Sequence, residues 1–213
     1  GTQRWSLRGR LHELPEDVRR RIDFRANHGH VVLDYARVCR RGIAGLRNDV
    51  LAMPADAPEA RRNRLAFASA VEALSTWARR HGDAAETARD ACQRFDRRRE
   101  LDDIAARCRR LARDRPRGLH DALQMVWFTQ NLLQAEGCSS AISFGRLDQA
   151  LWPFLQADLD AGRLGLDAAE ELLCCFWMKC CEAGESQNLV VGGCDERGQP
   201  AENPLSLLCL RVA

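Results

Sequence analysis

Lysine is almost absent from this chain: Lys179 is the only one among 32 basic residues, and the rest are arginines. Aromatic residues are also scarce, at 6% of the chain, and Tyr35 is the only tyrosine. No uncharged apolar run reaches the roughly 18 residues that a membrane-spanning helix needs. The first residues lack the apolar core of a signal peptide. We therefore expect no membrane association and a cytoplasmic location.

Neither sign of charge dominates the chain, since the formal net charge is +2. Acidic residues are interleaved with arginine pairs such as Arg79-Arg80 and Arg109-Arg110. A nucleic-acid-binding surface would gather its basic residues on one face with aromatic residues between them. The arrangement favours solvated helix faces. Only the arginine pairs would favour nucleic-acid binding, so we expect that the protein does not bind nucleic acid.

Ten cysteines are present, but their placement does not favour a disulfide framework. Most lie inside helical apolar patterns, and four of them fall within one predicted helix, at Cys174, Cys175, Cys180 and Cys181. We expect buried, reduced thiols. One straight helix cannot wrap four thiolates around one ion, so no metal site is expected there. His28 and His30 flank Gly29 without a nearby third ligand. A pocket-lining histidine and a turn histidine bonded to the backbone both remain open.

Helical periodicity dominates the chain, so we predict a mostly α fold with one or two short strands. Residues 172–178 are apolar nearly all round, which indicates a helix buried on most sides. Asp167 is a plausible N-cap for that helix. The predicted helices are 15–26, 34–53, 59–80, 84–113, 119–134, 147–159 and 168–182, and the predicted strand is 188–193.

The sharpest local pattern is the pentapeptide from Gly145 to Gln149. Gly145 permits a tight turn into a helix, and Asp148 falls in the first turn, where the helix dipole favours an anion. Arg146 offers a fork of five donors that could bridge a carboxylate elsewhere. Both a structural ion-pair hub and direct contact with a substrate are compatible with this pattern.

Several motifs in order resemble the pyruvate formate-lyase-like glycyl radical enzymes. That family reads roughly R-T-F-H-E-A-L-Q-x-x-W-F, then Q-x-E, then S-x-G-R-x-D-Q and a proline–aromatic pair, and upstream G-H-x-x-x-D-Y. The matching stretches here are 29–35, 117–128, 134–136, 143–149, 152–154, 170–173, 187–195 and 203–208. The resemblance spans residues 29–212, and the order of the matches is more specific than any single motif.

The resemblance implies a ten-stranded α/β barrel wrapped in helices. Residues 1–213 would form part of that domain, namely outer helices and about one barrel strand near 187–194. It also implies radical cleavage of a C–C, C–O or C–N bond in a small metabolite. The glycyl radical is a post-translational modification, so no bound cofactor is implied. A radical S-adenosylmethionine activating enzyme would install the radical, and a homodimer is expected.

The chain departs from the family where the radical residues are concerned. The family's G-C-x-E thiyl loop and its R-V-x-G-Y glycyl segment do not occur here, so no catalytic residue is assigned and the chain alone is expected to be inactive. Gly192-Gly193-Cys194-Asp195 matches the barrel-strand motif, so Cys194 is not given the thiyl role. The resemblance assigns His30 to substrate binding, which favours a dehydratase or C–N lyase over a formate acetyltransferase. The structural motif residues are Gly145, Arg146, Asp148, Gln149, Gln187 and Asn188.

Two further expectations follow. The chain does not begin with Met and stops in an apolar run, 205–213, so we expect a piece of a longer polypeptide. The alternative is a non-catalytic helical binding or scaffold module that kept the outer shell of the family.

Overall fold

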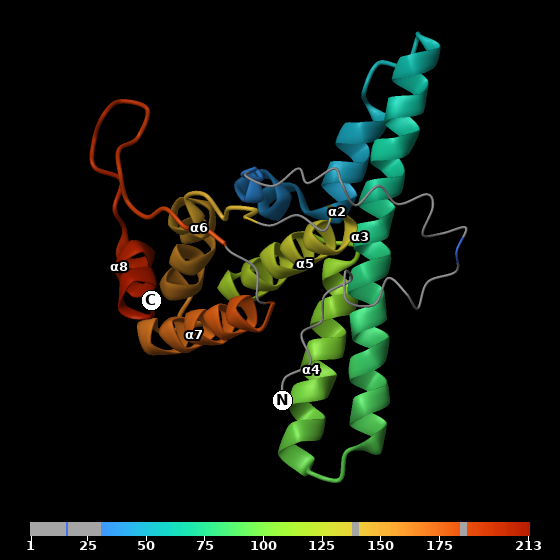
Figure 1. Ribbon diagram of the computed structural model, residues 1–213. Helices are drawn as coiled ribbons and strands as arrows, with labels where there is room; N and C mark the ends of the chain where they lie inside the picture. The colour runs from blue at the N-terminus through green and yellow to red at the C-terminus, as the bar shows by residue number, and fades with distance from the viewer. Residues whose placement is uncertain (1–15, 17–30, 138–140, 184–186) are drawn as a thin grey trace.

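A computed structural model describes residues 16, 31–137, 141–183 and 187–213. Helices make up most of this part, which confirms the predicted mostly α character (Figure 1). The helix predicted at 15–26 lies outside the described residues except for Glu16, which is helical, and so do His28 and His30. The named helices are α2 (Tyr35–Leu51), α3 (Pro58–Ala91), α4 (Phe95–Leu111), α5 (Leu119–Gly137), α6 (Leu147–Asp160), α7 (Leu166–Ala183) and α8 (Pro204–Arg211).

Helices α3 and α4 form a long antiparallel arm that extends beyond the rest of the molecule (Figure 1). The predicted division into helices 59–80 and 84–113 is wrong, because α3 runs without a break through 81–83 and the chain turns at 92–94. Gly82, which lies in the interval between the two predicted helices, serves helix packing. A β-carbon there would lie 3.3 Å from the Arg109 side chain and 3.4 Å from the Ala105 carbonyl oxygen.

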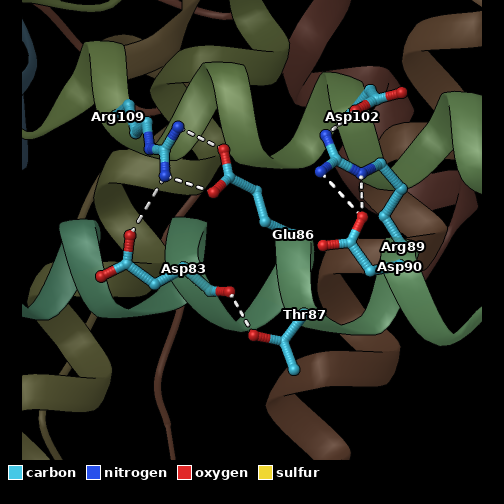
Figure 2. A network of polar contacts seen from close by, with 7 residues as sticks. All are labelled: Asp83, Glu86, Thr87, Arg89, Asp90, Asp102 and Arg109. Atoms are coloured by element: carbon cyan, nitrogen blue, oxygen red, sulfur yellow. Dashed lines mark hydrogen bonds and ion pairs between the residues drawn. The ribbon is translucent and has the colours of Figure 1, made fainter.

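Ion pairs join the outer faces of this arm (Figure 2). Arg109 on α4 contacts Asp83 and Glu86 on α3, and Arg89 on α3 contacts Asp102 on α4 at 2.7 Å. These pairs are exposed or half-exposed, so solvent and salt screen them and each contributes little to stability. The arginines of the arm thus act mainly as solvated helix faces, as their interleaving with acidic residues predicted.

Helix α2 confirms the prediction for 34–53 but contains a kink. Asp34 caps it by accepting a hydrogen bond from the Arg37 N–H at 2.8 Å. Gly42 has φ 60° and ψ 177° inside the helix. A β-carbon at Gly42 would lie 2.6 Å from the Arg115 Cα, so the backbone approaches closely there. The kink depends on glycine for both its positive φ and this close approach.

Helix α5 lies at the centre and contacts α2, α3, α4, α6 and α7. Its side chains Leu119, Ala122, Met125 and Val126 are completely buried. Burial of such side chains provides most of the driving force for folding. The part of the chain that carries the motifs is therefore built on the best-packed helix of the molecule.

Three short extended segments run parallel to one another beside these helices. Val32 bridges Ser143, and Gly145 bridges Leu189, so 142–145 lies between 31–33 and 188–190. The strand predicted at 188–193 needs correction: the described residues contain isolated bridges and no named strand. Gly192 and Gly193 both have positive φ, which ends the extended run early. The sequence missed the other two segments because three or four residues carry no alternation pattern.

Helix α7 occupies the predicted place, but Asp167 lies in its first turn instead of capping it. The prediction that α7 is buried on most sides is wrong. Leu173 and Phe176 are buried, whereas Met178 is 59% exposed and the thiols of Cys174, Cys175 and Cys181 are exposed. All nine described cysteines are free.

Helix α8 buries Leu205, Leu208 and Cys209, and it contacts α6 and α7. Leu207 and Leu210 remain more than 60% exposed, so only one face of the apolar run 205–213 is covered. In the described part of the chain, no helix is long and apolar enough to cross a membrane.

Candidate functional site

The turn from the middle extended segment into α6 is made by Gly145, whose φ is 59°. A β-carbon at this position would lie 2.7 Å from Cγ1 of Val32 on the neighbouring segment. Glycine is therefore required for two reasons, the left-handed backbone and the close neighbour. The turn places Asp148 in the first turn of α6, as the sequence predicted.

The Asp148 side chain is completely buried and joins three parts of the chain. Its Oδ1 accepts from the Gln149 N–H at 2.8 Å. Its Oδ2 accepts from the Gly192 N–H at 2.8 Å, the Ser206 hydroxyl at 2.5 Å and the Gln149 amide nitrogen at 3.0 Å. A buried carboxylate needs such donors, because leaving water without them is very costly. The carboxylate thereby fixes α6, the loop at Gly192 and α8 relative to one another.

Arg146 holds the same loop from the other side. Its two terminal nitrogens donate to the Gly192 carbonyl at 2.6 Å and to the Cys194 carbonyl at 2.9 Å. The ion-pair partner expected from the sequence is not found, since no described carboxylate contacts Arg146. A planar guanidinium can donate to two backbone carbonyls as well as to one carboxylate. The positive-φ turn at Gly192 and Gly193 presents those carbonyls on one side.

The remaining motif residues lie around this junction. The Gln149 side chain donates to the Ala201 carbonyl at 2.5 Å. The Asn188 carbonyl accepts from the Phe144 N–H at 2.8 Å and from the Ser143 hydroxyl at 2.9 Å. Both amide atoms of Gln187 are buried and have no hydrogen-bond partner among the described residues. Arg146, Asp148, Gln149 and the Asn188 carbonyl thus take part in one network of hydrogen bonds, in which the side-chain amide of Gln187 has no partner among the described residues.

A second set of hydrogen bonds, which the sequence did not reveal, anchors the middle extended segment, 142–145. The Tyr35 hydroxyl donates to the Gln130 amide oxygen, and the Gln130 amide nitrogen donates to the Ile142 carbonyl at 2.9 Å. Both side chains are buried, and burial raises the pKa of Tyr35, so it stays a neutral phenol. The available signals were a single tyrosine in the G-H-x-x-x-D-Y motif and a glutamine in an apolar stripe.

Ala141, just before Ile142, has a φ of 62°, the only positive value at a described non-glycine residue. Left-handed backbone costs a non-glycine residue about 1–2 kcal/mol. The Gln130–Ile142 hydrogen bond lies next to this position. The middle segment is therefore bounded by two left-handed residues, Ala141 and Gly145, and is anchored on both sides.

The described part of the chain contains no cluster of three His, Cys, Asp or Glu side chains that could hold a metal ion. His30 cannot be placed relative to the junction, because it lies outside the described residues. The Cys194 thiol is exposed, and only its backbone carbonyl contributes to the junction. The junction has a structural role: its hydrogen bonds hold backbone segments in register around the buried Asp148 carboxylate.

Comparison with known proteins gives this junction a context. The model of the family described as pyruvate formate lyase-like matches residues 17–213. The chain belongs to this family. The resemblance drawn from the ordered motifs is thereby confirmed over nearly the whole chain.

Among its curated relatives is the isethionate sulfite-lyase of Nitratidesulfovibrio vulgaris, which is 32% identical over 207 residues. That match covers 84% of this chain and 25% of the relative. Among solved structures, the B12-independent glycerol dehydratase of Clostridium butyricum superposes with a TM-score of 0.78 at 26% identity, covering 89% of this chain and 27% of that one. A glycyl radical enzyme of Archaeoglobus fulgidus gives a TM-score of 0.75 at 29% identity, covering 90% and 27%.

The pyruvate formate lyase-like chain therefore spans about a quarter of the length of the relatives that it matches. Those relatives are named as a lyase, dehydratases and a glycyl radical enzyme. Membership of an enzyme family does not favour the non-catalytic scaffold considered as the alternative.

Proposed function

We propose that the polypeptide of this chain is a glycyl radical lyase or dehydratase that cleaves a bond in a small metabolite. The observation that carries the proposal is the set of three parallel segments, 31–33, 142–145 and 188–190, followed by a loop that Asp148 and Arg146 hold at Gly192. A helical casing around parallel segments supports assignment to the ten-stranded barrel. The relatives include enzymes named for eliminating sulfite or water, which supports an eliminating reaction over acetyl transfer.

The role of this chain in that enzyme is positioning. The Arg146–Asp148 junction holds the loop after the extended segment 188–190, and α8 beyond that loop, against α6. The Tyr35–Gln130 connection holds the middle segment against α5. In this family the radical is carried by the glycine of the glycyl segment and the cysteine of the thiyl loop. Neither motif has a match among residues 1–213. His30, which precedes the first parallel segment, lines the substrate site.

The working enzyme is a cytoplasmic homodimer that carries a glycyl radical as a post-translational modification. A radical S-adenosylmethionine enzyme installs that radical. The bond cleaved is C–O or C–N, as expected from the histidine motif, or C–S, a class that the sequence did not suggest and that the sulfite-lyase relatives support.

The test is to express the reading frame that holds this chain together with a radical S-adenosylmethionine activating enzyme, without oxygen. We expect the electron paramagnetic resonance signal of a glycyl radical, and turnover of one substrate from a panel of isethionate, glycerol, 1,2-propanediol and trans-4-hydroxyproline. The 213-residue chain, treated in the same way, serves as the negative control. Absence of the radical signal from an activated, folded protein would overturn the proposal.

A further inference from the structure

The first and the middle parallel segments, 31–33 and 142–145, share little backbone pairing of their own. Among the described residues, one backbone hydrogen bond joins them, from the Ser143 N–H to the Val31 carbonyl at 2.8 Å. It accompanies the bridge between Val32 and Ser143. A slip of one residue between two such segments turns every side chain of one segment to the opposite face. The register of these two segments therefore needs a further connection.

Two buried side chains supply that connection, since Tyr35 is 1% exposed and Gln130 is 0% exposed. Tyr35 begins α2 directly after the first segment, and its N–H donates to the Leu33 carbonyl at 2.9 Å. Its hydroxyl donates to the amide oxygen of Gln130 on α5. The Gln130 amide nitrogen donates to the Ile142 carbonyl at 2.9 Å. The hydrogen bonds thus run from the first segment through the Tyr35–Gln130 pair to the middle segment, and they form a closed ring with the backbone bond between the segments.

The ring permits one register only. The Ile142 carbonyl can only accept, so Gln130 turns its amide nitrogen toward it and its amide oxygen toward the Tyr35 hydroxyl. Successive carbonyls of an extended segment point in opposite directions. A slip of one residue would therefore turn the carbonyl away and leave a buried amide unpaired, which is costly. The Tyr35 ring adds a contact with Phe144, at 5.8 Å between ring centroids.

The backbone beside the Ile142 carbonyl is strained. Ala141 has a φ of 62°. A left-handed conformation at a residue other than glycine persists only where the surrounding structure fixes it. The Gln130 hydrogen bond to the next residue is placed to do this. Loss of that bond should therefore let the start of the middle segment move.

We propose that Tyr35 and Gln130 are positioning residues, which fix the register of the first two parallel segments and thereby set the turnover rate of the enzyme. The effect on turnover rests on the proposed function. Phe144 is buried against Tyr35 and against Phe176 of α7, so the helices cover that face of the middle segment. Its neighbour Ser143 faces the other way, because side chains alternate along an extended segment. The Tyr35–Gln130 pair acts from the helix side and sets the position of that opposite face.

The experiment uses the product of the whole reading frame, activated without oxygen by a radical S-adenosylmethionine enzyme. Gln130→Met keeps the length of the side chain and removes both of its hydrogen bonds, whereas Tyr35→Phe removes only the hydroxyl. We expect kcat per glycyl radical, counted by electron paramagnetic resonance, to fall by about 10- to 100-fold in Gln130→Met, since a displacement of about 1 Å can cost about that much. KM should change far less. The double variant should lose no more than Gln130→Met alone, because the two residues act through the same hydrogen bonds.

Two control variants separate positioning from lost stability. Gln124→Met makes the same substitution at a half-buried glutamine of α5 that lies about 240° around the helix from Gln130. It should keep the kcat of the unchanged enzyme. Gly118→Ala, where a β-carbon would lie 2.4 Å from Asp158, destabilises the protein without contacting the Tyr35–Gln130 pair. At a temperature where it is folded, it should also keep its kcat per radical.

Hydrogen exchange tests the register without any reaction. In Gln130→Met and Tyr35→Phe, we expect the Ser143 amide, which donates to Val31, to exchange about tenfold faster, as expected for loss of about one hydrogen bond. Exchange in α3 and α4 should not change. Where circular dichroism shows that Gln130→Met does not fold, Tyr35→Phe, which loses one oxygen atom, provides the same comparison.

Three outcomes decide the proposal. A folded Gln130→Met enzyme that keeps its kcat per radical overturns it, and so does an equal loss of kcat in Gly118→Ala. An unchanged protein that acquires no radical overturns the proposed function instead. The Ser143 amide then decides the register: faster exchange in the variants supports the role of the Tyr35–Gln130 pair, and unchanged exchange overturns it.

Discussion

The Ser206 hydroxyl donates a 2.5 Å hydrogen bond to Oδ2 of Asp148, across 58 residues of sequence. Ser206 Oγ also belongs to the N-terminal capping box of α8, where it accepts from the Asn203 N–H at 3.0 Å. The Asn203 side chain in turn accepts from the first N–H groups of α8. The start of α8 is thus fixed by the same carboxylate that organises the start of α6.

Replacing Asp148 by asparagine tests this arrangement. The amide group of the Asp148→Asn variant would place an NH₂ near the donors Gly192 N–H and Ser206 hydroxyl, so at least one buried donor loses its acceptor. We expect the free energy of unfolding to fall by about 2–4 kcal/mol, because a buried group loses charge-assisted hydrogen bonds. Urea unfolding followed by circular dichroism measures the change.

Asp160→Asn is the matched control, because Asp160 ends the same helix and is exposed. That substitution should change stability by less than about 0.5 kcal/mol, as surface substitutions usually do. Equal effects of the two substitutions would show that the buried carboxylate has no special role.

The two hydrogen bonds of Arg146 lead to a separate prediction about the loop at 192–194. Lysine in place of Arg146 can donate to one of the two carbonyls but cannot span both, because its ammonium is a point donor. We expect Arg146→Lys to destabilise the chain by about 1 kcal/mol, the contribution of one hydrogen bond. Hydrogen exchange should quicken at 192–201 and stay unchanged in α3 and α4. Uniform acceleration across the whole chain would contradict a local role for the guanidinium.

The sequence predicted the helices far better than the junction, and the reason is physical. Helical periodicity is local, so the buried stripe of α5 from Leu119 to Val126 could be predicted directly. The partners of Asp148 are 44 and 58 residues away, and those of Arg146 are 46 and 48 residues away. A first-turn aspartate predicts an anion at a helix start, but nothing local identifies which distant donors it meets.

Glycine residues also show that local sequence cannot predict which distant segment a residue will contact. Gly82 lay between two predicted helices, although it is inside α3 and allows α4 to approach closely. Gly42 lay inside a predicted helix, although there its φ of 60° kinks α2. Glycine permits both a left-handed backbone and a close contact, so its identity alone cannot separate the two cases. The segment packed against each glycine decides between the two cases. That segment contains Arg109 for Gly82 and Arg115 for Gly42.

Gly118, which precedes α5, provides a third prediction. A β-carbon there would lie 2.4–2.5 Å from the carboxylate oxygens of Asp158. Asp158 is buried and accepts the Leu119 N–H at 2.7 Å, so it cannot move without losing that bond. We expect Gly118→Ala to destabilise the chain by about 2–3 kcal/mol through steric strain and the lost hydrogen bond. Thermal unfolding measures the loss.

Gly165→Ala is the control for this substitution, because a β-carbon at Gly165 meets nothing within 4 Å and its φ is not positive. It should leave stability unchanged or raise it slightly, by up to about 1 kcal/mol, since alanine restricts the unfolded chain. Similar destabilisation by both substitutions would mean that loss of glycine flexibility, and not the Asp158 contact, is responsible.

Asp121, in the first turn of α5, makes the stability depend on pH. Burial alone would raise its pKa, but hydrogen bonds from Arg110 and the Arg117 N–H, together with the charges of Arg110 and Arg107, lower the pKa below its ordinary value. Arg110 contacts Oδ2 at 2.5 Å and Arg107 contacts Oδ1 at 3.2 Å. The lowered pKa means that the folded state binds this proton more weakly than the unfolded state does.

The sign of the pH effect follows from that difference. Stabilisation by the Asp121 carboxylate is complete above its unfolded pKa of about 3.9, and it disappears as the pH falls through the lower, folded pKa. We expect Asp121→Asn to lower the free energy of unfolding by about 2 kcal/mol at pH 7, the size of a charged hydrogen bond. The difference from the unchanged chain should shrink as the solution is acidified below that unfolded pKa. Urea unfolding over this pH range gives the measurement, with Asp103→Asn on the exposed side of α4 as the control. A difference that stays constant down to the acid end would show that Asp121 acts through its shape and not through its charge.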